Sequence, residues 1–235
     1  MKVAVLLSGG LDSTTALHWA LRHHEVVCAL SFDYGSNHAA RELACARWQA
    51  EHCGVPYHEI DLRPISAHLE SALLSGADAI PTGEYAEENM KQTVVPFRNG
   101  IFLAIAAGIA ESKGAEGLVI AAHGGDHAIY PDCREEFMAA MSAAISHGTY
   151  ANLQILRPFI ASTKAEITAT GAELGVDFSH TYSCYCGGEQ HCGQCSTCRE
   201  RRESFAAASC RRNPPLQITA AWRFYSLLQF YETWF

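Results

Sequence analysis

The sequence lacks the features that would assign it to a membrane, to an export route or to a nucleic-acid surface. Its longest apolar run, residues 101–110, is too short to span a bilayer. One lysine and a short apolar stretch precede Ser8, which is not the pattern of a signal peptide. Basic residues form no block and the net charge is −8. We therefore expect a cytoplasmic protein with a small-molecule substrate, no nucleic-acid partner and no membrane contact.

Charged residues are also sparse, at 18% of 235 residues, whereas apolar residues reach 49%. A chain of this length and composition can form one large α/β domain with a small appendage. Short apolar runs alternate with helical patterns, and this alternation predicts a parallel sheet with helices on both faces. We expect strands at 2–7, 26–32, 57–62, 117–122 and 153–159, helices at 13–24, 38–53, 99–113, 134–147 and 163–174, and a long polar loop at 75–97.

The first expected strand ends in Ser-Gly-Gly-Leu-Asp-Ser, and a helix follows directly. Glycines let the backbone approach a ligand, and the free amides at a helix start bind phosphate. The loop lacks the lysine of the common loop that grips β- and γ-phosphates. The alternative is an ordinary tight turn with a serine cap. We expect this stretch to contact a nucleotide through Leu7, Ser8, Gly9, Gly10, Leu11, Asp12, Ser13, Thr14 and Thr15.

Five of the ten cysteines lie between Cys184 and Cys198. Without an export signal we expect a reducing compartment, where a tight cluster indicates a metal site rather than disulfides. Cys192, Cys195 and Cys198 form two overlapping Cys-x-x-Cys units, a spacing that lets thiolates converge on a tetrahedral zinc ion. From spacing alone the fourth ligand is Cys184, Cys186 or the nearby His191. A redox cluster, free thiols and an iron–sulfur cluster are the alternatives.

The Ser-Gly-Gly-Leu-Asp-Ser loop resembles that of the N-type ATP pyrophosphatases, which bind ATP and transfer AMP to an acceptor oxygen. Four further stretches, at 31–46, 94–115, 123–137 and 181–202, resemble the 7-cyano-7-deazaguanine synthase family. The resemblance implies a Rossmann-like, adenine nucleotide alpha hydrolase-like fold over residues 1–178. Residues 179–235 would form a zinc-binding segment, which the resemblance implies, and a C-terminal helical tail, which lies beyond the part of the chain that the resemblance covers.

This resemblance implies an ATP-dependent ligase that converts 7-carboxy-7-deazaguanine and ammonia to the nitrile, in queuosine precursor biosynthesis. Mg²⁺ would shield the phosphates, one structural zinc would bind Cys184, Cys192, Cys195 and Cys198, and the protein would be a homodimer. Another ATP pyrophosphatase, such as a tRNA thiolation enzyme, is the alternative. A non-enzymatic zinc-ribbon module is a further alternative, but it has no need of the glycine loop.

The resemblance also assigns roles to single residues inside and outside the loop. Asp12, Ser13, Arg98 and Lys164 are the expected catalytic residues, and Phe32 lies where this superfamily holds adenosine. Arg98 would bind phosphate or the substrate carboxylate, unless it makes a surface salt bridge. Lys164 stands at a helix start, where Thr163 and Glu166 have the spacing of a capping box. The helix dipole there opposes a cation, so an anionic ligand would remove the conflict; solvent exposure is the alternative. The expected substrate-binding residues are Tyr34, Asn99, Asp126, Tyr130, Asp132 and Arg134.

Three other features carry expectations. We expect His123 and His127 to be pocket histidines rather than metal ligands, and Cys133 to be structural or pocket-lining. The family often has glutamine where this chain has Ser36. In the tail, 218–235, apolar side chains share a helical face, which predicts packing on the body of the protein or on a dimer partner.

Overall fold

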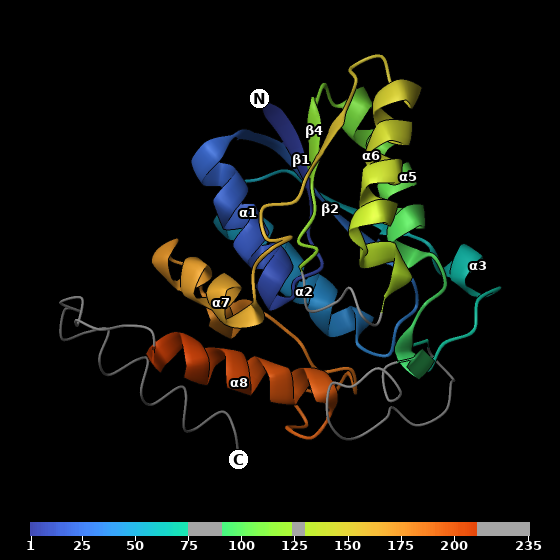
Figure 1. Ribbon diagram of the computed structural model, residues 1–235. Coiled ribbons are helices and arrows are strands. Elements are labelled where there is room, and N and C mark those ends of the chain that lie inside the picture. The colour runs from blue at the N-terminus through green and yellow to red at the C-terminus, as the bar shows by residue number, and fades with distance from the viewer. Residues whose placement is uncertain (75–90, 124–129, 211–235) are drawn as a thin grey trace.

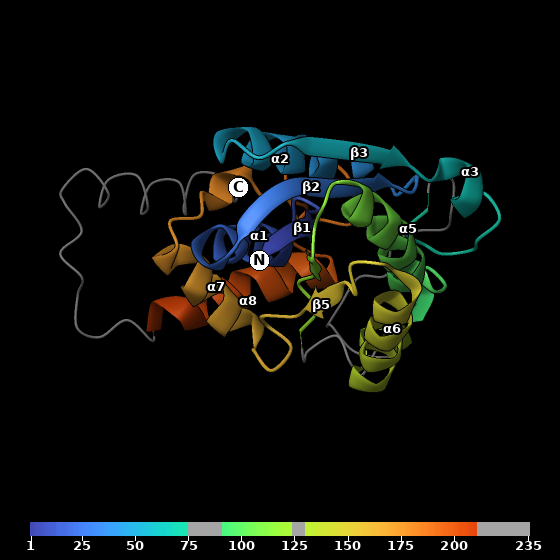
Figure 2. The same ribbon diagram turned by 90° about the horizontal axis from the view of Figure 1, so that it is seen from above.

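The computed structural model describes residues 1–74, 91–123 and 130–210. It contains a five-stranded sheet in the order β3-β2-β1-β4-β5, and every neighbouring pair of strands is parallel (Figures 1 and 2). The strands are β1 (Lys2–Leu6), β2 (Glu25–Asp33), β3 (Tyr57–Asp61), β4 (Gly117–Val119) and β5 (Gln154–Leu156). The predicted parallel sheet is therefore confirmed. The tail at 218–235 and most of the loop predicted at 75–97 lie outside the described residues.

Helices cover both faces of the sheet, as predicted (Figure 2). The α-helices are α1 (Leu11–His23), α2 (Ala39–His52), α3 (Arg63–Ser66), α5 (Arg98–Ser112), α6 (Glu135–Gly148), α7 (Lys164–Glu173) and α8 (Ser196–Cys210). Short 3₁₀ turns lie at Lys91–Thr93, Pro131–Cys133 and Phe178–His180.

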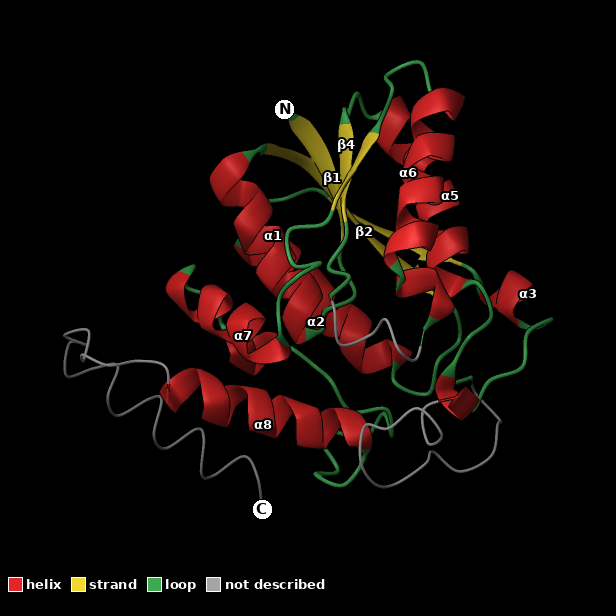
Figure 3. Cartoon of the chain, viewed as in Figure 1, coloured by secondary structure: helices red, strands yellow, loops and turns green. Residues whose placement is uncertain are grey.

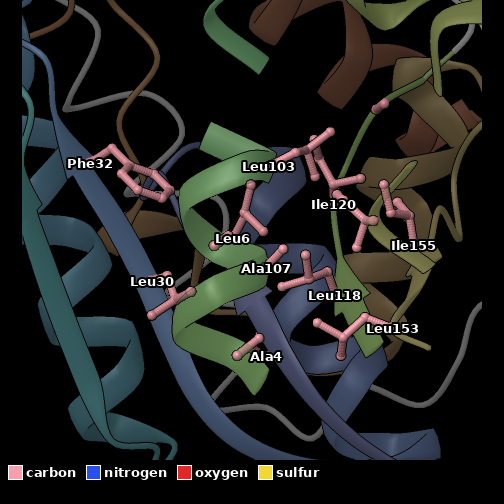
Figure 4. Packing of buried hydrophobic residues seen from close by; sticks show 14 of the residues in the cluster. Ala4, Leu6, Leu30, Phe32, Leu103, Ala107, Leu118, Ile120, Leu153 and Ile155 are labelled. Atoms are coloured by element: carbon pink, nitrogen blue, oxygen red, sulfur yellow. The ribbon is translucent and has the colours of Figure 1, made fainter. Parts of the chain in front are cut away.

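Successive side chains of β1 and of the residue after it, Leu7, point alternately to the two faces of the sheet and so contribute to two separate hydrophobic clusters. Val3, Val5 and Leu7 pack with α1, α2 and α7, whereas Ala4 and Leu6 pack with α5 and α6 on the opposite face. Successive side chains of a strand point to opposite faces, so a strand buried on both faces is apolar throughout. Figure 4 shows the cluster that contains Ala4 and Leu6, in which residues of α5 lie against β1, β4 and β5.

The helix α5 is the apolar segment that most resembles a membrane span. Among the described residues, Lys91–Ser112 is long and apolar enough to cross a membrane by length and composition. Its α-helical part has 15 residues, or about 22 Å, which is shorter than the roughly 30 Å of a bilayer core. Leu103, Ala106 and Ala110 are fully buried against the sheet. These observations identify α5 as a core helix.

Apart from the one-turn helix α3, the structure differs from the predicted elements in two places. β4 and β5 are only three residues long each, and the residues that follow β4, Ile120, Ala121 and Ala122, line a cavity. The second difference is α8, which we did not predict. Figure 3 shows it below α7, on the side toward which β1 runs, and it packs against α7. The domain boundary at residue 178 stays a prediction.

Candidate active site

The strand order reverses direction at β1: β2 and β3 lie on one side of it and β4 and β5 on the other. In open parallel sheets, ligands bind outside the carboxyl ends of the strands at such a switch point. The glycine loop follows β1 at this position, and a cavity of about 250 Å³ opens there. The fold therefore places the predicted loop at the position where a ligand site is expected.

Gly9 lets the loop lie directly on α2. Its φ is +87°, in the region that favours glycine. A Cβ at this position would lie 2.8 Å from the backbone nitrogen of Ala46 and nearer still to the carbonyl oxygen of Glu42. No residue with a side chain fits here without moving α2.

The two serines of the loop hold each other. The Ser8 and Ser13 hydroxyls lie 2.9 Å apart, and the Ser8 backbone N–H donates to the Ser13 hydroxyl. The Gly10 N–H donates to the Ser8 hydroxyl at 3.3 Å. These bonds shape a turn at the first residues of α1, where the helix dipole favours an anion.

Asp12 and Lys164 form the charged centre of this end of the cavity. Lys164 is the first residue of α7, and the predicted capping box between Thr163 and Glu166 is confirmed. The Lys164 Nζ lies 2.5 Å from Oδ2 of Asp12 and 3.5 Å from a carboxylate oxygen of Glu200. The Oδ1 of Asp12 is buried and has no hydrogen-bond partner. A buried, unpartnered carboxylate oxygen beside a phosphate-type loop fits a Mg²⁺ ion, which prefers oxygen ligands.

The opposite end of the cavity surrounds Arg98, near the start of α5. Its guanidinium donates to the Tyr34 hydroxyl at 3.4 Å and lies over that ring, 5.6 Å from the centroid. The Tyr130 hydroxyl lies 3.5 Å from that of Tyr185. Phe32 stacks on Phe102 with ring centroids 4.4 Å apart. This end therefore combines one cation with flat aromatic surfaces.

Two residues that we did not predict also line this end: His38, the N-terminal cap of α2, and Glu42 in the first turn of that helix. His38 Nε2 lies 3.5 Å from a carboxylate oxygen of Glu42. Burial raises the pKa of Glu42 to about 8, although the charge of Arg98 opposes the shift. Burial, aided by Arg98, lowers the pKa of His38 to about 4. The imidazole is therefore neutral at pH 7 and supplies no charge to its neighbour.

The segment after α7 forms a further wall. The Tyr182 N–H donates to the Gly9 carbonyl at 3.0 Å, so this wall is bonded to the glycine loop. Gly187 has a φ of +71°, and a Cβ there would lie 2.8 Å from the carbonyl carbon of Asn37. Arg201 of α8 is buried and donates to the Ser183 hydroxyl and the Phe178 carbonyl. Tyr182 and Tyr185 reach the cavity through these contacts.

Four cysteines meet behind this wall. The sulfur atoms of Cys184, Cys192, Cys195 and Cys198 lie within 4.8 Å of one another. Backbone N–H groups donate to Cys184 and Cys192, and hydrogen bonds from Cys195 and Cys198 lower the pKa of the Cys184 thiol. Four sulfurs at this spacing fit a tetrahedral zinc ion.

The two alternative ligands lie outside this group. His191 Nε2 accepts a hydrogen bond from the Ser183 N–H at 3.1 Å, and burial lowers its pKa to about 4. Cys186 is exposed. The geometry therefore favours Cys184 as the fourth ligand.

The structure brings most of the predicted site residues to one cavity. Those that line it are Leu7, Ser8, Gly10, Leu11, Asp12, Ser13, Phe32, Tyr34, Arg98, Asn99, Tyr130 and Lys164. Cys133 lines it too, as the pocket-lining interpretation predicts, and accepts a hydrogen bond from the Asn99 side chain. Buried His123 lies 3.9 Å from Asp12.

Other predicted residues do not reach the cavity wall. Gly9, Thr14 and Thr15 pack behind it. The Asp132 carboxylate instead accepts the backbone N–H of Asn99 at 2.8 Å and so supports the start of α5. Arg134 is exposed before α6. Asp126 and His127 lie outside the described residues.

The fold and the loop define a class, the α/β proteins that carry a phosphate-type loop at the switch point of an open parallel sheet. A solved structure with this fold is the U34-tRNA thiolase NcsA from Methanococcus maripaludis with its 4Fe–4S cluster, at a TM-score of 0.50 and 15% identity over 93% of this chain and 74% of that one. This likeness shows the fold alone.

The sequence comparisons are more specific. The family model described as queuosine biosynthesis protein QueC matches residues 2–209, and the chain belongs to this family. A protein of Porphyromonas gingivalis named 7-cyano-7-deazaguanine synthase is 51% identical over 85% of this chain and 90% of its own length. One of the same name from Brucella anthropi is 47% identical over 88% and 90%.

Proposed function

We propose that this chain is an ATP-dependent carbon–nitrogen ligase that converts 7-carboxy-7-deazaguanine and ammonia to 7-cyano-7-deazaguanine, in queuosine precursor biosynthesis. The observation that carries the proposal is the cavity. It has a phosphate-type loop with Asp12 and Lys164 at one end, and Arg98 among aromatic rings at the other. Membership of the family and the names of the curated relatives support the same substrates.

The chemistry requires two activations. A carboxylate oxygen attacks the α-phosphorus of ATP, pyrophosphate leaves, and the acyl adenylate forms. Ammonia attacks its carbonyl carbon, AMP leaves, and the amide forms with loss of a proton. The amide oxygen then attacks the α-phosphorus of a second ATP and pyrophosphate leaves. Loss of AMP and of both N–H protons gives the nitrile. Both activations are adenylyl transfers, so one pocket can serve both.

The residues at the loop end have roles in binding and charge. Amides and hydroxyls of Ser8, Gly10 and Ser13 would hold the phosphates. Lys164 would stabilise the charge that develops on the leaving pyrophosphate, a role typically worth 10²–10³-fold in rate. Asp12 would hold Mg²⁺ through its buried Oδ1, and the ion would supply electrostatic shielding of the triphosphate.

The residues at the other end would hold the rings. Phe32, Leu7 and Leu11 all line the cavity and offer the adenosine apolar surface. Tyr34, Tyr130 and Asn99 would contact the deazaguanine, and Arg98 would bind its carboxylate. Asp126, Asp132 and Arg134 stay predictions, although the contacts of Asp132 described above favour a structural role.

Zinc at the four cysteines would be structural, because four thiolates leave no open coordination position. Its task would be to hold the Tyr182–Tyr185 wall against the glycine loop. We further propose a cytoplasmic homodimer. Static light scattering at several protein concentrations tests the dimer, and a mass equal to one chain at all of them would contradict it.

One assay tests the function. The purified protein is incubated with ATP, Mg²⁺, ammonium and 7-carboxy-7-deazaguanine, and the products are measured by mass spectrometry. We expect the nitrile with two AMP per molecule formed. ADP as the nucleotide product would refute adenylylation. No nitrile in this mixture, together with a thiolated tRNA in a parallel incubation with ATP, tRNA and a sulfur donor, would favour the tRNA thiolation alternative.

A further inference from the structure

We propose that Glu42 recognises the N–H edge of the deazaguanine ring, beside an Arg98 that binds the adjacent oxygen atoms. The inference rests on the proposed function and adds to it the orientation of the substrate in the cavity. Both side chains line the cavity, and the role of Glu42 does not follow from the sequence pattern.

Glu42 is the carboxylate that the other side chains leave available. Three carboxylates of described residues line the cavity: Asp12, Glu42 and Glu200. Asp12 and Glu200 both lie near Lys164, at 2.5 Å and 3.5 Å. Glu42 contacts the neutral His38 at 3.5 Å, and Arg98 acts on it only through space. Glu42 is partly buried, with 19% of its side chain exposed, and a carboxylate in this position without a paired cation gains from hydrogen-bond donors supplied by a ligand.

The geometry of α2 directs this carboxylate away from the phosphate site. The carbonyl oxygen of Glu42 lies against Gly9 of the loop. Side chains of a helix tilt toward its N-terminus, and the contact with His38, at the start of α2, shows that Glu42 does so. The carboxylate therefore lies beyond the loop, at the end of the cavity that contains Arg98 and the aromatic rings.

The substrate presents a matching row of groups along one edge. Its 7-carboxylate and 6-oxo oxygens lie side by side and accept hydrogen bonds. The N1–H and the 2-amino group come next and donate them. Arg98 offers only donors, and Glu42 offers only acceptors when it is ionised. Its raised pKa keeps Glu42 protonated near pH 7 in the absence of a ligand, and hydrogen bonds donated by the N–H groups of the ring would favour the ionised form. With Arg98 at the oxygens and Glu42 at the N–H groups, the 7-carboxylate would lie nearest the rest of the cavity and so the phosphate end.

The test is binding, measured by calorimetry. Wild-type protein, Glu42→Ala and Glu42→Gln are each titrated with 7-carboxy-7-deazaguanine and with its analogue lacking the 2-amino group. A hydrogen bond to a charged group is worth about 1.5–3 kcal/mol, so we expect wild-type protein to bind the analogue about 10- to 100-fold more weakly. In Glu42→Ala this preference should fall to within about threefold, and in Glu42→Gln, whose amide oxygen still accepts one bond, it should be intermediate.

The control is Glu200→Gln, a cavity carboxylate that lies near Lys164, and it should keep the wild-type preference. If Glu42→Ala weakens binding of both compounds equally, Glu42 does not read this edge and the inference is wrong. If the alanine variant does not fold, the isosteric glutamine variant decides, because an unchanged preference in it contradicts the inference. Wild-type protein that binds the ring with the expected preference but forms no nitrile would contradict the proposed function and leave this inference standing.

Discussion

The two walls of the cavity are held by different forces. The glycine loop lies between β1 and α1, and buried residues of the main core, among them Val5, Leu7 and Leu11, surround it. The wall at Tyr182–Tyr185 has a much smaller apolar cluster, which consists of Tyr182 and three of the cysteines with Cys45 packed beside them. The position of the first wall depends on apolar residues buried between the sheet and its helices. The position of the second wall depends on contacts around the four cysteines that could hold a metal ion. Substitutions in one wall should therefore have effects that differ from those of substitutions in the other.

The largest effect should come from Gly9→Ala, in the first wall. The substitution requires a left-handed conformation of alanine and moves the backbone of α2. The combined cost is about 2–6 kcal/mol, and we expect loss of detectable ATP binding. Urea unfolding and ATP calorimetry measure the two effects.

The matched control for this variant is Gly10→Ala. Gly10 has an extended conformation, and its nearest neighbour would be the Ser8 hydroxyl at 3.4 Å. We expect a loss of stability below about 1 kcal/mol. Equal stability of both variants would show that α2 does not constrain the loop.

Next in size is Lys164→Met, which removes a contact shared by both sides of the cavity. Lys164 contacts Asp12 of the first wall and Glu200 of α8. We expect kcat for nitrile formation to fall about 10²-fold, because a cation aimed at the leaving pyrophosphate is lost. Lys113→Met, at the end of α5, should not change kcat. If Lys164→Met raises KM and leaves kcat unchanged, Lys164 contributes to ground-state binding instead.

The first wall and the charged centre could be predicted because their signals are local. Glycines after an apolar strand indicate a phosphate loop, and Thr163 with Glu166 indicates a helix start. The structure confirms the strand and the helix start, and phosphate binding by the loop stays a prediction. The four cysteines also follow from spacing and resemblance, and the structure brings them together.

The rest depends on which elements meet in space. His38 and Glu42 belong to the first turns of α2 and carry no local signal of a ligand site, so they were missed. Asp132 occurs among pocket residues in the sequence, yet it bonds to the start of α5. The polar sequence of α8 has no apolar stripe of the usual width, so its packing against α7 and the buried Arg201 follow from tertiary contacts only.

The second wall is tested by Cys195→Ser. Loss of one thiolate should release bound zinc, measured by atomic absorption, and lower the unfolding temperature by on the order of 10 °C. Nitrile formation should fall about tenfold or more, because Tyr182 and Tyr185 line the cavity. Cys186→Ser, at an exposed cysteine outside the cluster, should keep the metal and the activity. Full activity in metal-free Cys195→Ser would show that the second wall needs no metal.

The smallest effect concerns Glu42, whose helix touches both walls: its carbonyl lies at Gly9, and Asn37, just before the helix, lies at Gly187. Burial raises the pKa of Glu42 from 4.5 to about 8. Between these values the folded protein retains a proton that the unfolded chain has released. Raising the pH through this window therefore destabilises the fold, and the penalty is complete above about pH 8.

Glu42→Gln removes this penalty, since an amide does not titrate. Without ligands, we expect the unfolding temperature of Glu42→Gln relative to wild type to rise by a few degrees between pH 5 and pH 8.5. Glu51→Gln, at an exposed position of the same helix, corrects for changes unrelated to burial. A relative unfolding temperature that stays constant over this range would mean that water reaches the carboxylate in the empty cavity. Glu42 would then belong to an open entrance rather than to the buried junction of the two walls.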